Sequence, residues 1–192
     1  MKWSARLAVI GLVAALAAGG VVASDPYLLV RAQFQGQRVL AGLDVATTTV
    51  ADHRWVYAHA GRAAVDGPAD APDHVPVVVM LHGFTGSKEN WYPLAEHLHG
   101  KYRLLIPDLP GWGESERKPN ADYGFGAQAE RVAAFIRAVS PGKPVVLLGH
   151  SMGGGASLLA AADDPQIAAV ANMAPAETRP SAVAAITRVT VP

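Results

Sequence analysis

Residues 145–157 read V-V-L-L-G-H-S-M-G-G-G-A-S, and this stretch decides how the chain folds. Its first four residues are apolar, as is typical of a buried strand, and a run rich in glycine follows them. The stretch also fits the pattern G-x-S-x-G, in which a serine lies at a sharp turn between a strand and a helix. Small residues beside the turn relieve crowding, so we expect the hydroxyl of Ser151 to be exposed.

The sequence on both sides of this turn predicts strands that alternate with helices. Apolar runs without polar alternation predict buried strands at 76–81, 103–107, 145–148 and 167–173. Apolar residues at helical spacing predict helices at 91–98, 132–139 and 152–162. We therefore expect an α/β fold with a mostly parallel sheet and helices on both faces.

The ends of the chain have their own patterns. Asp25-Pro26 predicts the start of a helix over residues 27–43, and β-prone runs at 47–50 and 54–59 predict a hairpin. Near the C-terminus we expect a short helix at 182–186. The predicted organisation is a leader at 1–23, an N-terminal helix and first strand at 24–50, and a partial α/β domain at 51–192.

The leader has the pattern of an export signal. Lys2 and Arg6 precede an uncharged apolar run at 7–23, which ends in small residues. We expect either a signal peptide cleaved after Ala23 or an uncleaved anchor, with a cytosolic helix as the third alternative. In the first two cases the rest of the chain is periplasmic or extracellular, or is held at the inner membrane by this segment.

Composition narrows the classes of partner and cofactor. The 192 residues carry a formal net charge of zero, and only 17% of them are charged, with no block of one sign. This balance argues against a nucleic-acid partner, because phosphate binding needs a basic face. The chain has no cysteine, so disulfides, thiol chemistry and cysteine metal sites are absent. We expect neither a metal nor a cofactor.

Two further loops follow predicted strands and are rich in glycine. They read L-H-G-F-T-G at 81–86 and D-L-P-G-W-G-E-S at 108–115. Active sites of open α/β sheets lie at the carboxyl ends of the strands, so we expect both loops to meet the Ser151 turn there. Trp91 and Trp112 could line an acyl pocket at this edge, although buried packing is an equal alternative.

These three loops carry a resemblance to a known family. With H-G-F-T-G-S, D-L-P-G-W-G-E-S and G-H-S-M-G-G, the chain resembles the α/β-hydrolase superfamily in its lipase and esterase branch, from about residue 55 to residue 192. The resemblance implies Ser151 as the nucleophile. It also implies that the backbone N–H groups of Phe84 and Met152 form the oxyanion hole, and that no cofactor is needed.

Four other residues are candidates for supporting roles. We expect His82 to order its loop, Asp108 to hold its loop through backbone hydrogen bonds, and His150 to pack beside the serine. Glu177 lies just beyond the predicted strand at 167–173, where some members of the family place their acid, and it is a candidate for that role.

The order of parts in this family predicts that the chain is incomplete. A serine hydrolase of this fold has its serine first, then the acid, then the histidine. All seven histidines of this chain precede Ser151, and residues 188–192 resemble the lead-in to the strand that ends in the catalytic aspartate. We therefore expect a chain that lacks the catalytic His and Asp with the last strands and helices, and that is inactive by itself.

The leading functional hypothesis is hydrolysis of small-molecule or lipid carboxylic esters through an acyl-enzyme on Ser151. One alternative is another serine chemistry on the same fold, such as that of a haloperoxidase, an amidase or a carbon–carbon hydrolase. A second alternative is a non-catalytic exported binding module. A serine rather than an aspartate at the turn argues against epoxide hydrolase chemistry.

Overall fold

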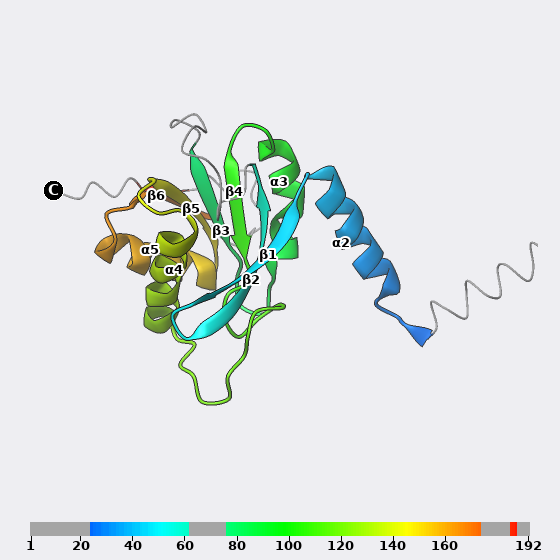
Figure 1. Cartoon of the computed structure of the whole chain (residues 1–192), viewed down its shortest axis with the longest axis horizontal. Helices are drawn as coiled ribbons and strands as arrows, with labels where there is room; N and C mark the ends of the chain where they lie inside the picture. Colours follow the sequence, from blue (N-terminus) through cyan, green and yellow to red (C-terminus); the bar gives the residue numbers. More distant parts are fainter. Residues whose placement is uncertain (1–23, 62–75, 174–184, 188–192) are drawn as a thin grey trace, which may run out of the picture. The chain divides into compact units, whose positions relative to one another are not determined.

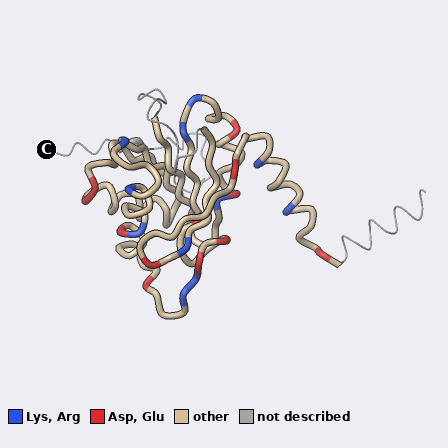
Figure 2. Tube along the Cα trace, in the orientation of Figure 1, with Lys and Arg blue, Asp and Glu red and all other residues tan. Residues whose placement is uncertain are grey.

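The computed structural model describes residues 24–61, 76–173 and 185–187. The expectations for the leader at 1–23 and for Glu177 lie outside these residues. The chain divides into two compact units, Met1–Gln37 and Arg38–Pro192. Acidic and basic residues are interspersed along the described parts of the chain and are not segregated by sign (Figure 2).

The first described element is helix α2, Leu28–Leu40. Asp25 stabilises the turn before it, because its carboxylate accepts a hydrogen bond from the Tyr27 N–H at 3.1 Å and pairs with Arg31 at 2.7 Å. The helix has no buried residue. Within the described residues, no helix has the length and apolar character needed to cross a membrane.

The second unit is built on one seven-stranded sheet with the order β1-β2-β4-β3-β5-β6-β7 (Figure 1). The strands are Asp44–Val50, His53–Ala60, Val77–Leu81, Arg103–Pro107, Val145–His150, Ile167–Met173 and Ala185–Thr187, in chain order from β1 to β7. The four central strands β4, β3, β5 and β6 are parallel, whereas β1, β2 and β7 pair antiparallel with their neighbours. The hairpin expected near residue 50 is β1 and β2.

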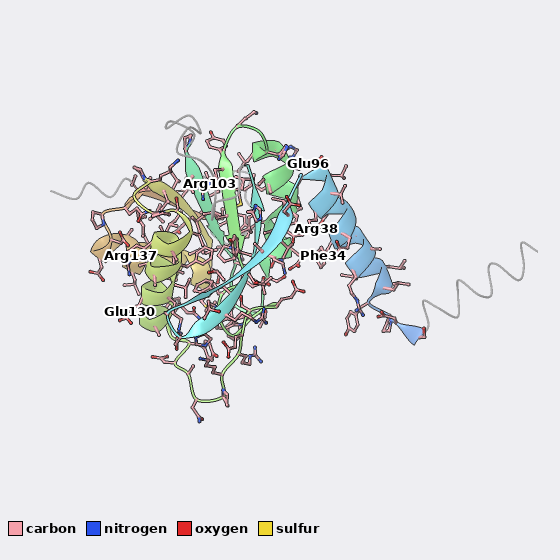
Figure 3. The ribbon with its side chains drawn as sticks, in the orientation of Figure 1. Phe34, Arg38, Glu96, Arg103, Glu130 and Arg137 are labelled. Carbon is pink, nitrogen blue, oxygen red and sulfur yellow. The ribbon has the colours of Figure 1, made fainter. Side chains whose placement is uncertain are left out.

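Helices cover both faces of the sheet, which confirms the predicted fold class. On one face, α4 (Phe125–Val139) and α5 (Met152–Asp163) pack on a core that includes a stack of Trp55 on Phe135, with ring centroids 4.7 Å apart. On the other face, the 3-10 helix η1 (Lys88–Trp91) and α3 (Tyr92–Leu98) cover a second core around Met80. Arg137 of α4 (Figure 3) pairs at 2.6 Å with Asp164, which follows α5.

The prediction of a short helix at 182–186 is wrong for residues 185 and 186, which the structure describes. Residues 185–187 form strand β7, in which Ala185 lies opposite Asn172 and Thr187 lies opposite Val170 of β6. Alanine favours a helix, but Ile186 and Thr187 are β-branched, and one helical turn closes few hydrogen bonds. The edge of β6 offers ladder hydrogen bonds that such a short helix lacks.

Candidate active site

Three loops meet at one edge of the sheet because they follow neighbouring parallel strands. Strand β3 lies between β4 and β5, and all three point the same way. Their carboxyl ends lead into the loops that begin at His82, Asp108 and Ser151 respectively. The sequence therefore predicted correctly where these three loops come together.

Ser151 lies in a strained turn between β5 and α5. Its backbone has φ 50° and ψ −116°, a conformation that non-glycine residues rarely adopt, and the residue is exposed. The turn is possible because its neighbours lack side chains. A β-carbon at Gly149 would lie 2.5 Å from the Gly154 Cα, and one at Gly153 would lie 2.3 Å from the Leu81 carbonyl oxygen.

The loop after β3 lies directly against this turn. A β-carbon at Gly83 would be 3.2 Å from the Ser151 Cβ and 2.8 Å from the His150 Nδ1. Gly83 and Ser151 form this contact, and Phe84 and Met152 are the next residues along the chain after each of them. Among the described residues, the backbone N–H groups of Phe84 and Met152 have no hydrogen-bond acceptor. Two unpaired N–H groups therefore belong to residues beside this contact, and that of Met152 lies in the first turn of a helix, where negative charge is stabilised.

His82 is fully buried and uses both of its ring nitrogens inside the fold. Its Nδ1 donates to the Gly83 carbonyl oxygen at 2.8 Å, and its Nε2 accepts the Leu109 N–H at 2.9 Å. Burial lowers the pKa of His82 below its usual value, because the charged imidazolium would lose its hydration. The ring is neutral at pH 7 and joins the loop after β3 to the loop after β4.

Asp108 is also fully buried and holds the same two loops together. Its carboxylate accepts hydrogen bonds from the Lys88 N–H at 2.6 Å, the Lys88 Nζ at 2.9 Å and the Glu114 N–H at 2.8 Å. Lys88 is 1% exposed and also pairs with Glu89 at 2.9 Å. Burial alone would lower the pKa of Lys88, but the charge of Asp108 and hydrogen bonds to the carboxylates raise it well above its usual value.

Sequence reasoning missed Lys88. The signal that could have found it is Asp108 itself, which directly follows a buried apolar strand. A carboxylate at such a position needs a cation or several N–H donors, because a buried unpaired charge is costly. His150 is half-buried beside the turn and lines a cavity. Five of the seven predicted site residues thus lie around one turn, Asp108 braces their loops, and Glu177 lies outside the described residues.

Two cavities flank the loop after β3. The first has a volume of about 510 Å³, and its lining includes Trp91, Leu94 and Met173 beside Gly83 and His150. Its size and apolar wall are typical of small-molecule sites. Ser151 does not line this first cavity, but its neighbours Gly83 and His150 do.

The second cavity, of about 500 Å³, lies on the side of Trp112 and Arg117. Phe84 lines both cavities and meets Trp112 edge-to-face, with ring centroids 5.9 Å apart. Of the two tryptophans named from the sequence, Trp91 lines the first cavity and Trp112 lines the second. Among the residues that the structure describes, no three His, Asp or Glu side chains gather as a metal site would require.

Comparisons with known proteins agree with this geometry. The family described as "alpha/beta hydrolase fold" matches residues 76–189. "Lipase 1" of Psychrobacter immobilis is 34% identical over 133 residues, which cover 69% of this chain and 38% of that lipase. "Monoacylglycerol lipase ABHD6" of Bos taurus is 29% identical over 130 residues, which cover 67% and 36% of the two chains.

A solved structure extends the similarity. The crystal structure of "a membrane phospholipase A, a novel bacterial virulence factor" superposes with a TM-score of 0.68 at 34% identity, covering 87% of this chain and 51% of that one. This chain therefore spans about half or less of the length of the proteins it matches.

The glycines around Ser151 generate the first prediction. We expect Gly153→Ala to lower the free energy of unfolding by about 2–3 kcal/mol, because its β-carbon would meet two backbone carbonyls that cannot rotate away. Gly126→Ala in α4 is the matched control, because a β-carbon there meets nothing within 4 Å and should stabilise the helix by up to about 1 kcal/mol. Urea unfolding measures both, and equal effects would contradict the packing described here.

Burial of His82 generates the second prediction, on pH. Because the pKa of His82 is lowered in the fold, the unfolded chain binds a proton first as the pH falls. The stabilisation is therefore complete above about pH 6.5 and is lost as the pH drops below that value. The His59 pKa is also lowered by burial, so the comparison must be with His82→Gln. Between about pH 7 and 5, we expect the free energy of unfolding in urea to fall less steeply for that variant than for the unmodified chain. Parallel curves of this free energy against pH would refute the prediction.

Proposed function

The chain belongs to the α/β-hydrolase family, and from this we propose that it carries the nucleophile of a carboxylic-ester hydrolase acting on small-molecule or lipid esters. The observation that carries the proposal is the strained, exposed Ser151, next to Met152 and close to the loop of Phe84, whose backbone N–H groups have no acceptor among the described residues. Such a backbone conformation costs free energy to maintain, and strained residues of this kind are concentrated at functional sites. The names of the lipases that resemble the chain favour lipid esters.

The proposed chemistry has two steps. The Ser151 Oγ attacks the ester carbonyl carbon while a base takes its proton, and the carbonyl oxygen becomes an oxyanion held by the N–H groups of Phe84 and Met152. The carbon–oxygen bond of the ester then breaks, the alcohol leaves with a proton, and the acyl group stays on Ser151. Water next cleaves this acyl-enzyme. The first cavity, with Trp91 and Leu94 in its wall, accommodates the acyl chain.

The general base is a separate part of the proposal. His82 does not fit the role, because both of its nitrogens are bonded in a buried site. No histidine follows Ser151 in the sequence. We propose that the base and the acid that orients it come from residues that this chain does not contain, which is in keeping with the fraction of its relatives that it spans.

The proposed absence of the general base from this chain gives the third prediction. We expect the 192-residue chain to hydrolyse p-nitrophenyl butyrate about 10⁴–10⁶ times more slowly than a complete triad would, because loss of one triad member costs on that order in turnover. p-Nitrophenolate leaves without a general acid, so this activated ester should still acylate Ser151 slowly. Water attack on the acyl-enzyme has no base to assist it, so the butyryl group should accumulate on Ser151, where peptide mass spectrometry can locate it.

Two variants control this experiment. Ser151→Ala should abolish the adduct, whereas Ser157→Ala should retain it, because Ser157 is fully buried on the same helix and donates to the Gly153 carbonyl oxygen. An adduct that persists in Ser151→Ala would refute the assignment of the nucleophile. Acylation by amides or thioesters in preference to esters would favour another serine chemistry, and no acylation with any of them would favour a binding module.

We also propose that the N-terminal part of the chain brings the protein to a membrane after export. Residues 7–23 are uncharged and apolar, and α2 follows them with exposed Leu29, Val39 and Leu40. The charged residues of α2 are Arg31 and Arg38, and none is acidic. Figure 3 labels Arg38 on this helix. Such a helix suits the interface of a bilayer that contains anionic lipid.

The fourth prediction tests this location. The full chain should float with vesicles of phosphatidylglycerol and phosphatidylcholine, and replacing Leu29 and Val39 by Ser should weaken flotation of a chain that starts at Ser24 by about tenfold, through lost apolar burial. The proposal would be contradicted if the two substitutions left flotation of the chain that starts at Ser24 unchanged. Recovery of the tagged full chain in the cytosol after fractionation would also contradict it.

A further inference from the structure

The second cavity is lined by an exposed cation, Arg117, that is hydrogen-bonded within its own loop but has no acidic partner among the described residues. Arg117 lines this cavity, and its guanidinium donates through Nε at 2.8 Å, and also through Nη2, to the Gly111 carbonyl oxygen. Among the described residues, no carboxylate forms an ion pair with Arg117. Within the part of the chain that the structure describes, its Nη1 has no hydrogen-bond acceptor.

The wall beside Arg117 is fixed by a network that reaches back to the β1–β2 turn. The ring of Trp112 meets the ring of Tyr123 edge-to-face at 5.7 Å, and the Tyr123 hydroxyl accepts the Lys118 N–H at 2.6 Å. Buried His53 lies between the Tyr123 hydroxyl, at 3.3 Å, and the Asp52 carboxylate, at 2.7 Å. Trp112 is thereby held in position before any ligand arrives.

Arg131 completes this network. Its guanidinium lies 5.5 Å from the centre of the Tyr123 ring and pairs with Asp52 at 3.1 Å. The pKa of Asp52 is held well below its usual range, and the largest cause is the hydrogen bond that its carboxylate accepts from Arg131. In contrast to Arg117, this arginine is therefore neutralised by a carboxylate. The two arginines have different tasks, since Arg131 braces the loop and Arg117 presents an unused charge to the cavity.

We propose that the second cavity binds an anionic group, a phosphate or a carboxylate, on the alcohol side of an amphiphilic ester substrate. The ligands that we propose on the protein side are the guanidinium of Arg117 and the hydroxyl of Thr85, two exposed residues that line this cavity. A planar guanidinium with a free edge is the side chain best suited to such oxygens. The inference rests on the proposed ester hydrolysis only for calling the ligand a substrate.

The position of Phe84 relates the two cavities to one substrate. Phe84, Thr85 and Gly86 line both cavities, and the preceding Gly83 lies against Ser151. An ester whose carbonyl oxygen meets the Phe84 N–H can place its acyl chain along the apolar wall of the first cavity. Its alcohol part then extends past the Phe84–Trp112 pair toward Arg117. The substrate class is therefore an anionic amphiphile and not a neutral ester.

Calorimetric titration tests this inference with three probes, namely octyl phosphate, octanol and inorganic phosphate. One hydrogen-bonded contact to a charged group contributes about 1.5 kcal/mol, so the 192-residue chain should bind octyl phosphate about tenfold more tightly than octanol. Arg117→Gln should abolish this preference and leave octanol binding unchanged. Arg137→Gln is the matched control, because it removes the same charge from an exposed site on α4 and should keep the preference.

A second measurement needs no variant and protects the test against a misfolded Arg117→Gln. Octyl phosphate should shield Arg117 of the unmodified chain from phenylglyoxal, while octanol should not, and Arg137 should react equally in all samples. Equal octyl phosphate binding by the Arg117 variant, or no protection of Arg117, would overturn the inference. Inorganic phosphate that binds Arg117 as tightly as octyl phosphate would also overturn it, by showing a free-anion site.

These outcomes are independent of those for the proposed function. The titration does not involve the hydroxyl of Ser151, so anion binding can fail while acylation of Ser151 succeeds. The reverse result, anion binding without acylation, would leave the subsite in place on a protein that binds such amphiphiles but does not cleave them.

Discussion

The site depends on two missing β-carbons. The first turn of α5 packs so closely on the sheet that Gly149 touches Gly154, and Gly153 touches the carbonyl groups that end β3. No side chain fits at these contacts without moving the backbone. This close approach sets the position of the helix and forces the strained backbone of Ser151 out toward solvent. The neighbouring free N–H groups follow from the same geometry, because they belong to the two turns that meet there.

A second constraint keeps the surrounding loops in register with that turn. Buried Asp108 binds the backbone and the ammonium group of Lys88, while His82 accepts the Leu109 N–H. A buried ion pair gives little net stability compared with apolar packing, but loss of one partner is costly. Its value here is positional, because the loops after β3 and β4 cannot shift separately. The Phe84–Trp112 pair, contributed by the same two loops, inherits that fixed spacing.

Most of the fold and the location of the site could be predicted from the sequence, because both depend on local patterns. The apolar strand β6 and the turn at Ser151 are read from consecutive residues, and their ends agree with the structure. Contacts between distant residues could not be read in this way. The partnership of Lys88 with Asp108 spans 20 positions, and that of Asp52 with Arg131 spans 79. Strand β7 was missed because its pairing with β6 outweighs the helix propensity of alanine.

In the proposed mechanism, the Ser151 turn and the two N–H groups of Phe84 and Met152 together form a site for an oxyanion. The most direct measurement is a crystal structure of the chain after reaction with an alkyl fluorophosphonate. We expect phosphorus bonded to the Ser151 Oγ, with one phosphonyl oxygen about 2.7–3.1 Å from the backbone nitrogens of Phe84 and Met152. An adduct on another residue, or a phosphonyl oxygen that points to solvent away from both nitrogens, would contradict it.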